Sequence, residues 1–232
     1  MSTKHDWISL LPANHLVGEY SVWSADLVRL ADEMARIDPY ADILHFDVAD
    51  GHFAPAFLFF PDLVAAIRKI SKKPIHVHLM VTDEIVLPQI EQFAEVGADL
   101  ISFHLENANV AEAALDKLAA LNVAAGMVLR VETPVAGVAQ YLARLRFLTL
   151  LGTKIGVKGQ GLDDTACSRL KEARRLIDAS GATKRIVLAA DGGIREHTVP
   201  LLRQAGAETV VLGSLAFNAP DLAQRINWLH SL

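Results

Sequence analysis

The chain of 232 residues lacks features on which several classes of protein depend. It contains a single cysteine, Cys167, which excludes a disulfide framework and a cysteine-rich zinc site and favours a reducing compartment. No segment approaches the ~18–20 consecutive apolar residues that a membrane-spanning helix requires. The amino-terminal residues carry charge and do not resemble a signal peptide. These absences predict a cytoplasmic protein with no membrane partner.

Positive charge and aromatic side chains are also scarce. The chain has 22 Lys and Arg against 27 Asp and Glu, a net charge of −5, so it lacks the basic surface that nucleic acids attract. Aromatic residues make up only 6% of the chain, although 52% of it is hydrophobic. A hydrophobic content drawn mainly from Ala, Leu, Val and Ile favours buried strands that alternate with Ala-rich helices. No nucleic-acid partner is expected.

Short apolar runs alternate with longer amphipathic stretches along the whole chain. This pattern predicts strands at 19–23, 43–47, 75–80, 100–104, 124–129, 147–151, 186–190 and 209–212. It predicts helices at 26–37, 61–70, 85–96, 111–121, 134–145, 164–179, 196–205 and 220–229. Strict alternation indicates parallel βαβ units, and eight of them in this length indicate closure. We therefore predict an α/β fold, a single-domain (β/α)₈ TIM barrel at 18–232, with an N-terminal cap at 1–17.

Three predicted strands carry polar side chains on the face that points into the barrel. Because alternate residues of a barrel strand face the lumen, the second strand points His45 and Asp47 inward, and the seventh points Asp191 inward. The third strand offers His78 and, one layer deeper, His76, which the alternation does not distinguish. Barrel enzymes hold their active sites at the carboxyl ends of the strands.

A buried carboxylate without a partner costs several kcal/mol, so this polar group requires a shared partner. Two imidazoles and two carboxylates suit zinc, iron, manganese or cobalt better than magnesium or calcium. A hydrogen-bonded polar layer without a metal is the alternative that the pattern leaves open.

Small residues gather after the last three predicted strands, where barrels often bind phosphate. Glycine lets backbone N–H groups approach an anion closely. The residues of this candidate phosphate cradle are Gly156, Gly159, Gly192, Gly193, Gly213 and Ser214. Lys158, in the first of these loops, either contacts the anion or is a solvated loop residue. His104, at the end of the fourth strand, is expected to be a hydrogen-bonded lumen residue.

Several segments resemble motifs of the ribulose-phosphate 3-epimerase family. The sequence LHFDVADGHFAP at 44–55 is similar to the family signature HxDxMDGxFVP, and HVHLM at 76–80 is similar to the HLM motif. Shorter matches follow the family order at 20–26 (PSILSAD), 103–106 (HxE), 190–194 (xDGGI) and 213–214 (GS). The resemblance implies a metal-dependent 3-epimerase acting on a phosphorylated ketose of the ribulose/xylulose 5-phosphate type. Family members are often dimers or larger, so a homo-oligomer is an open expectation.

The resemblance also assigns roles to individual residues. The four metal ligands match His45, Asp47, His78 and Asp191, which would hold one divalent transition metal per chain. Asp47 and Asp191 also match the acid/base pair that moves the C3 proton between opposite faces, while the metal stabilises the enediolate. Ser21 and Met80 match substrate contacts.

The chain departs from the family pattern around the substrate. Two methionines of the family are replaced by Ala49 and Leu151, and the loops at 56–61 and 154–160 are rewritten. Phe57, in the first of these loops, is expected to line the pocket mouth. These departures predict a preferred ketose phosphate other than ribulose 5-phosphate, such as a tetrulose or hexulose phosphate.

Two other functions stay open. A sugar-phosphate lyase or decarboxylase of the same barrel superfamily would carry a DxKxxD motif in the third strand, and the segment here has no lysine. A non-catalytic sugar-phosphate-binding barrel would have little use for two opposed carboxylates.

Overall fold

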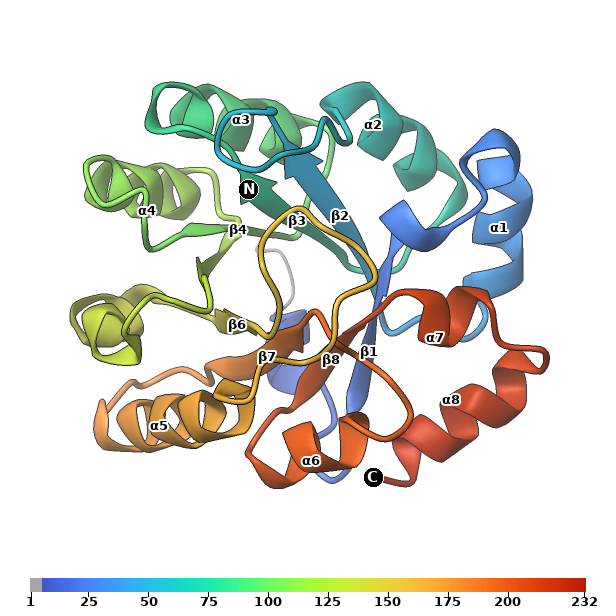
Figure 1. Ribbon diagram of the computed structural model, residues 1–232. Coiled ribbons are helices and arrows are strands. Elements are labelled where there is room, and N and C mark those ends of the chain that lie inside the picture. Colours follow the sequence, from blue (N-terminus) through green and yellow to red (C-terminus); the bar gives the residue numbers. More distant parts are fainter. Residues whose placement is uncertain (1–5) are drawn as a thin grey trace.

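Eight parallel strands pair in chain order, and the last strand pairs with the first, so the sheet closes into a barrel (Figure 1). The computed structural model describes residues 6–232. The strands are β1 (Val17–Ser21), β2 (Ile43–Ala49), β3 (Ile75–Met80), β4 (Leu100–His104), β5 (Ala124–Leu129), β6 (Phe147–Leu151), β7 (Val187–Asp191) and β8 (Thr209–Leu212). The prediction of a single-domain (β/α)₈ barrel is confirmed.

Helices form a ring around the barrel in Figure 1. The α-helices are α1 (Leu30–Ile37), α2 (Pro61–Ile70), α3 (Asp83–Glu95), α4 (Ala111–Ala120), α5 (Ala166–Ala179), α6 (Val199–Gln204), α7 (Ser214–Phe217) and α8 (Leu222–His230). The 3₁₀ helices are η1 (Trp7–Leu10), η2 (Val22–Ser24), η3 (Leu27–Arg29) and η4 (Val135–Arg144). No helix among residues 6–232 is long and apolar enough to cross a membrane.

Several predicted boundaries were wrong by one or two residues. The first strand ends at Ser21 instead of residue 23, because the next residues form η2. The second strand continues to Ala49, and the seventh ends at Asp191. The helix predicted at 134–145 is the 3₁₀ helix η4, whose Gly137 and β-branched valines have low α-helical propensity. The short helix α7 was not predicted.

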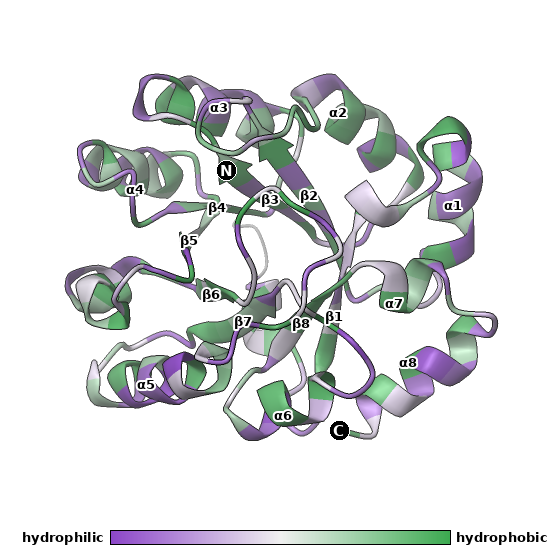
Figure 2. Cartoon of the chain, viewed as in Figure 1, coloured by the Kyte–Doolittle hydropathy of each residue, from purple (hydrophilic) through white to green (hydrophobic). Residues whose placement is uncertain are grey.

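The core between the sheet and the helices is built by the outward side chains of the strands. In β2 these are Leu44, Phe46 and Val48, which pack in the same hydrophobic cluster as Val64 and Ile67 of α2. Figure 2 shows the strands mainly green and the helices with purple and green faces. Burying one such side chain stabilises the fold by ~1.5–3 kcal/mol.

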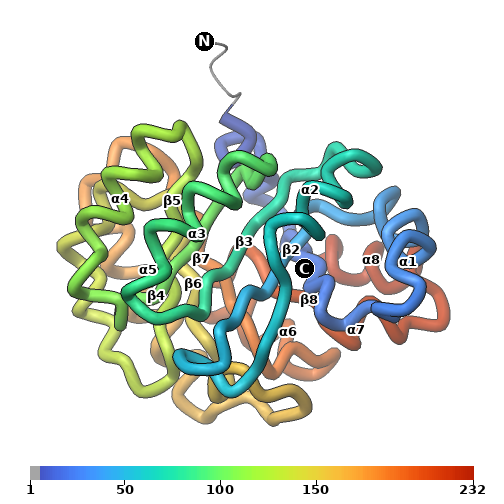
Figure 3. Tube along the Cα trace, turned by 90° about the horizontal axis from the view of Figure 1, so that it is seen from above, coloured from blue at the N-terminus to red at the C-terminus, as the bar shows by residue number. Residues whose placement is uncertain are grey.

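A smaller apolar cluster fills the barrel lumen at the amino ends of the strands. Its residues are Ile43, Val17, Leu100, Phe147, Val187, Ala189 and, from η1, Ile8. The Trp7 ring lies 6.3 Å from that of Phe147, centroid to centroid. An N-terminal cap was predicted at 1–17. Residues 1–5 of it lie outside the described residues, and η1 packs against the amino ends of the strands. Figure 3 shows the blue residues of η1 at one end of the barrel and the yellow β6–α5 loop at the other.

Candidate active site

Pairing between strands brings the four candidate ligands to the carboxyl ends of β2, β3 and β7. Asp47 lies beside His78, and Asp191 lies beside Leu151. One ligand atom from each of His45, Asp47, His78 and Asp191 lies within 4.8 Å of every other. His45 Nε2 and His78 Nδ1 each lie 3.3 Å from Asp47 Oδ1, and His78 Nδ1 lies 3.8 Å from Asp191 Oδ2. The structure therefore gathers the predicted ligand set around one point.

Two nitrogen atoms in this group have no hydrogen-bond partner. They are His45 Nε2 and His78 Nδ1, which are both buried and both face the carboxylates. Buried polar atoms are nearly always hydrogen-bonded, so two orphans side by side require an explanation. Imidazole nitrogens and carboxylate oxygens are ligands that transition metals accept. The residues therefore fit a divalent metal ion.

The charges around this point favour a bound cation. Burial alone would lower the pKa of His45, but the negative charges of Asp47 and Glu19 and the hydrogen bond to Glu19 raise it well above its ordinary value. Burial would raise the pKa of Asp47, and the two imidazoles beside it lower that pKa instead. Burial and the charge of Asp47 raise the pKa of Asp191 to about 6. The two carboxylates thus differ in proton affinity, as acid/base partners do.

A second polar layer lies deeper in the lumen. Glu19 Oε2 accepts hydrogen bonds from His45 Nδ1 at 3.1 Å and His76 Nδ1 at 2.6 Å, and Glu19 Oε1 accepts one from Thr209 Oγ1 at 2.6 Å. Ser102 Oγ lies 2.7 Å from His76 Nε2. Every imidazole nitrogen of His76 is therefore occupied, which makes it part of a hydrogen-bonded layer and leaves His78 to face the cavity.

His104 extends the network on the other side of His78. The Nε2 atoms of His78 and His104 lie 2.9 Å apart, and His104 Nδ1 lies 3.1 Å from Glu106 Oε2. Thr133 Oγ1 and the backbone N–H of Arg130 also donate to Glu106. His104 is a hydrogen-bonded lumen residue, as the sequence predicted. Burial lowers the pKa of His104 to about 4, so the ring is neutral near pH 7.

A cavity of about 350 Å³ opens above the four ligands. It is lined by Asp47, His78 and Asp191, whereas His45 is fully buried beneath them. The structure places all nine residues expected to contact substrate on the cavity wall: Ser21, Met80, Gly156, Lys158, Gly159, Gly192, Gly193, Gly213 and Ser214. Four of these glycines have positive φ, at 156, 159, 192 and 193, a conformation that other residues rarely adopt.

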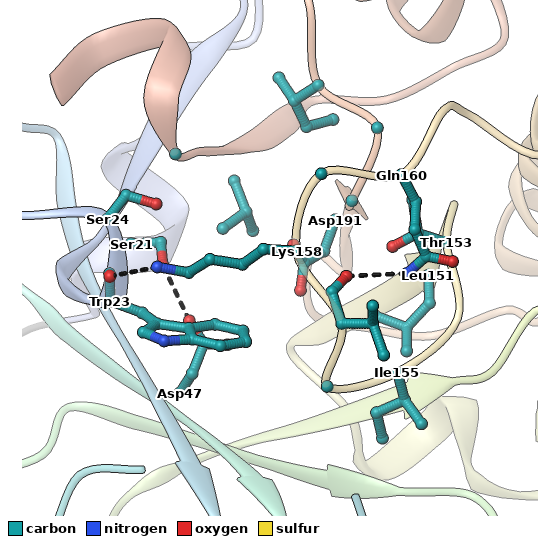
Figure 4. Close-up of a pocket in the computed structure, with 18 of the residues that line it drawn as sticks. Ser21, Trp23, Ser24, Asp47, Leu151, Thr153, Ile155, Lys158, Gln160 and Asp191 are labelled. Atoms are coloured by element: carbon teal, nitrogen blue, oxygen red, sulfur yellow. Dashed lines mark hydrogen bonds between the residues drawn. The ribbon is translucent and has the colours of Figure 1, made fainter. Parts of the chain in front are cut away.

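The β6–α5 loop bends over this cavity in Figure 1. Its conformation is fixed by Gln160 Nε2, which donates to the carbonyl oxygens of Lys154 and Val157 at 2.9 and 2.7 Å. From this loop Lys158 extends across the cavity in Figure 4. Its Nζ donates to the Trp23 carbonyl oxygen at 2.6 Å and lies 4.4 Å from the centroid of the Trp23 ring. The Lys158 side chain therefore spans the cavity mouth and places its positively charged ammonium group beside Trp23.

The prediction for Phe57 was wrong. Its side chain is 83% exposed and lies outside the cavity lining. Residue 57 forms an isolated antiparallel bridge with Asp50, and its ring lies over Gly51, where a Cβ atom would come within 2.4 Å of it. This backbone pairing turns the ring away from the pocket.

Sequence reasoning missed several residues at the site. Trp23, Thr153, Gln160 and Arg195 line the cavity. Each lies within or next to one of the segments 20–26, 154–160 and 190–194, which were compared with the family motifs. Their position in the sequence could therefore have identified them as site residues. Glu19 gave no comparable signal, because its role depends on contacts with β2, β3 and β8.

A closed parallel barrel that gathers carboxylates and imidazoles below a glycine-rich rim is typical of enzymes of the (β/α)₈ class. A family model described as the ribulose-phosphate 3 epimerase family matches residues 19–217. The chain belongs to this family of isomerases that act on carbohydrates.

Relatives of similar length support this assignment. Ribulose-phosphate 3-epimerase 1 of Cupriavidus necator is 35% identical over 206 residues, which cover 87% of this chain and 84% of that protein. The ribulose-phosphate 3-epimerase of Bacillus subtilis is 32% identical, with 89% of this chain and 94% of the relative covered. That of Escherichia coli K12 is 33% identical, with 91% and 93% covered.

Two solved structures share the fold at low sequence identity. A 3-hexulose-6-phosphate synthase has a TM-score of 0.64 at 18% identity, with 93% of this chain and 96% of that chain covered. The orotidine 5′-phosphate decarboxylase of Pyrococcus horikoshii has a TM-score of 0.65 at 12% identity, with 93% and 98% covered. These similarities support the barrel fold alone.

Proposed function

We propose that the protein epimerises a phosphorylated ketose at C3 by proton transfer between two carboxyl groups. The observation that carries this proposal is the arrangement of Asp47 and Asp191 around two unpartnered imidazole nitrogens on the floor of the cavity. Inversion of a carbon centre requires acid/base groups that reach it from opposite sides. β2 and β7 are separated by two strands in one direction around the barrel and by four in the other.

The glycine-rich rim is suited to the phosphate group. Positive φ at Gly192 and Gly193 turns the backbone at the end of β7, directly beside Asp191. Backbone N–H groups in such turns bind anions well because no Cβ atom blocks their approach. A phosphate held at the rim would leave the sugar carbons to extend toward the two carboxylates.

Proton transfer would use the two aspartates in turn. Ser21 Oγ donates to Asp47 Oδ2 at 2.8 Å, which fixes the orientation of this carboxylate (Figure 4). One carboxylate accepts the C3 proton, and the other carboxyl group delivers a proton to the opposite face. Positioned acid/base groups of this kind contribute typically ~10²–10⁴-fold in rate.

We infer that His45, Asp47, His78 and Asp191 hold one divalent transition metal, which is zinc, iron, manganese or cobalt. When bound, such an ion supplies positive charge that stabilises the negative oxygen formed as C3 loses its proton. Ser21 and the imidazoles orient the carboxylates, and the β6–α5 loop limits access of water to the cavity.

The residues around the reacting carbons support a substrate other than ribulose 5-phosphate. Leu151 lines the cavity, Ala49 lies in a small cluster with Met80, and Lys158 adds charge at the mouth. A changed shape and charge at these positions alter which ketose phosphate the transition state fits best.

The experiment is a hydrogen-exchange screen in D₂O with tetrulose, pentulose and hexulose phosphates, followed by NMR of the C3 proton. We expect exchange at C3 and formation of the C3 epimer with at least one of them. Asp191→Asn is the matched control, which should remove net epimerisation. Cleavage or decarboxylation of the sugar would favour a lyase, and binding without exchange would favour a non-catalytic barrel. If kcat/KM for ribulose 5-phosphate exceeds that for every other ketose phosphate by about tenfold, the specificity proposal is wrong and the proposed reaction stands. A tenfold ratio corresponds to a difference of ~1.4 kcal/mol in transition-state free energy.

A further inference from the structure

The two candidate histidine ligands face the site through different ring nitrogens. His45 presents Nε2, whereas His78 presents Nδ1, and both atoms lack a hydrogen-bond partner. A neutral imidazole binds a metal only through the nitrogen that carries no proton. The site therefore requires opposite tautomers from two neighbouring rings, and the structure contains a separate hydrogen-bond chain behind each.

The tautomer of His45 follows from its contact with Glu19. Glu19 is fully buried and receives hydrogen bonds from His45 Nδ1, His76 Nδ1 and Thr209 Oγ1. An ionised carboxylate can only accept, so the proton of His45 must lie on Nδ1. The lone pair of His45 then lies on Nε2, which is the atom that faces Asp47.

The tautomer of His78 follows from a chain that is one residue longer. Glu106 Oε2 accepts from His104 Nδ1 at 3.1 Å, so the proton of His104 lies on Nδ1 and its Nε2 is an acceptor. His104 Nε2 lies 2.9 Å from His78 Nε2, which must therefore donate. The lone pair of His78 is left on Nδ1, the atom beside Asp47 and Asp191.

We propose that Glu19 and Glu106 are positioning residues that set these opposite tautomers and thereby prepare both rings for the metal. This proposal rests on the metal site of the proposed function. Each carboxylate is itself held by donors outside the ligand set, Thr209 for Glu19 and Thr133 for Glu106. The carboxylates, and not the threonines, fix the histidine protons, and outer-shell partners that hold a metal-ligating histidine typically change metal affinity by ~10–100-fold when they are replaced.

The test uses Co²⁺ as the probe and does not depend on turnover. Its dissociation constant is measured by competition with a chelator for the parent protein, Glu19→Gln and Glu106→Gln. The amide keeps the size of the side chain but removes its charge and one acceptor oxygen. We expect each variant to bind Co²⁺ about 10–100-fold more weakly.

Two matched controls remove a neighbouring contact without touching the chain to the histidines. Thr209→Val and Thr133→Val each delete one donor to the same carboxylates, and both should hold Co²⁺ within about threefold of the parent, well below the outer-shell effect. If they weaken binding as much as the Gln variants, general loosening of the lumen explains the result and the proposal is wrong. Unchanged affinity in both Gln variants would also overturn it.

A second measurement reads the tautomers directly in the metal-free parent protein, at a pH high enough to make both rings neutral, because the carboxylates beside His45 raise its pKa well above the ordinary value. Long-range ¹H–¹⁵N NMR of the imidazole rings should show the proton on Nδ1 of His45 and on Nε2 of His78. The opposite pattern at either ring would refute the proposal even if a Gln variant fails to fold. Metal-free rings with the expected tautomers, in a protein that exchanges no C3 proton, would contradict the proposed function and leave this inference standing.

Discussion

Replacing Gly193 by alanine tests whether the glycine rim holds the phosphate group. Gly193 has φ of +70°, and a Cβ atom added there would lie 2.7 Å from Leu162 Cα and 3.0 Å from Leu162 Cβ. Leu162 belongs to the β6–α5 loop that covers the cavity. The added methyl group at residue 193, after β7, therefore displaces the backbone of the β6–α5 loop. Both segments belong to the proposed phosphate cradle.

Gly181 provides a matched control. Its φ is +64°, close to that of Gly193, but nothing lies within 4 Å of an added Cβ atom. Gly181→Ala therefore isolates the backbone cost of a left-handed alanine, which is ~1–2 kcal/mol. Gly193→Ala carries the same cost plus the overlap with Leu162, which adds ~1–3 kcal/mol if it resembles overpacking elsewhere. Each kcal/mol corresponds to roughly 2–4 °C in Tm for a chain of this size.

The effect on binding should separate the two variants more clearly than stability does. A displaced loop that loses one hydrogen bond to the charged phosphate forfeits ~1.5–3 kcal/mol. This loss raises KM for a ketose phosphate, and the inhibition constant of inorganic phosphate, by about tenfold to a hundredfold. Steady-state kinetics and thermal melts of both variants provide the comparison. Equal Tm values for the two variants would show that the overlap with Leu162 costs nothing. A lowered Tm with an unchanged KM in Gly193→Ala would refute the placement of the phosphate at this rim.

Four further predictions concern separate parts of the molecule. The purified protein should contain one transition-metal ion per chain by elemental analysis, and His78→Ala should lose it while keeping the far-ultraviolet circular dichroism of the barrel. Asp191→Asn should lower kcat/KM by about 10²–10⁴-fold, and a loss below about tenfold would leave this residue a structural role only. Lys158→Met should raise KM with little change in kcat, Lys158→Arg should restore KM, and a KM equal to that of the parent in Lys158→Met would assign the lysine to solvent. A hydrogen bond from Arg146 lowers the pKa of Asp6 from 3.8 to about 2, so the stabilisation by this contact is present above pH 3.8 and disappears as the pH falls through 2. Asp6→Asn should therefore lower Tm at pH 7, which corresponds to a loss of no more than about 1 kcal/mol in the free energy of unfolding. The difference in Tm from the parent should close between pH 4 and 2.

The sequence alone determined the barrel because its signal is local. Alternating strand and helix patterns are set by neighbouring residues, and eight such units in a chain of this length indicate a closed parallel sheet, which the structure has. The alternation of side chains along each strand likewise placed His45, Asp47 and Asp191 on the lumen face, and the structure brings them together. The errors in the secondary structure were at element ends, such as the turn of the first strand into η2, in the type of the helix at 134–145, which is 3₁₀, and in the short helix α7, which was not predicted.

Only the tertiary structure decided how those residues work together. Alternation could not separate His76 from His78, because both face the lumen and only contacts with Glu19 and Ser102 occupy both nitrogens of His76. The lysine at 158 reaches the carbonyl of Trp23, 135 residues earlier in the chain. Such contacts depend on strand register and loop conformation, which arise from packing between distant segments. The pattern along one strand determines which face of the sheet a side chain points to, whereas the folded barrel determines which residues that side chain contacts.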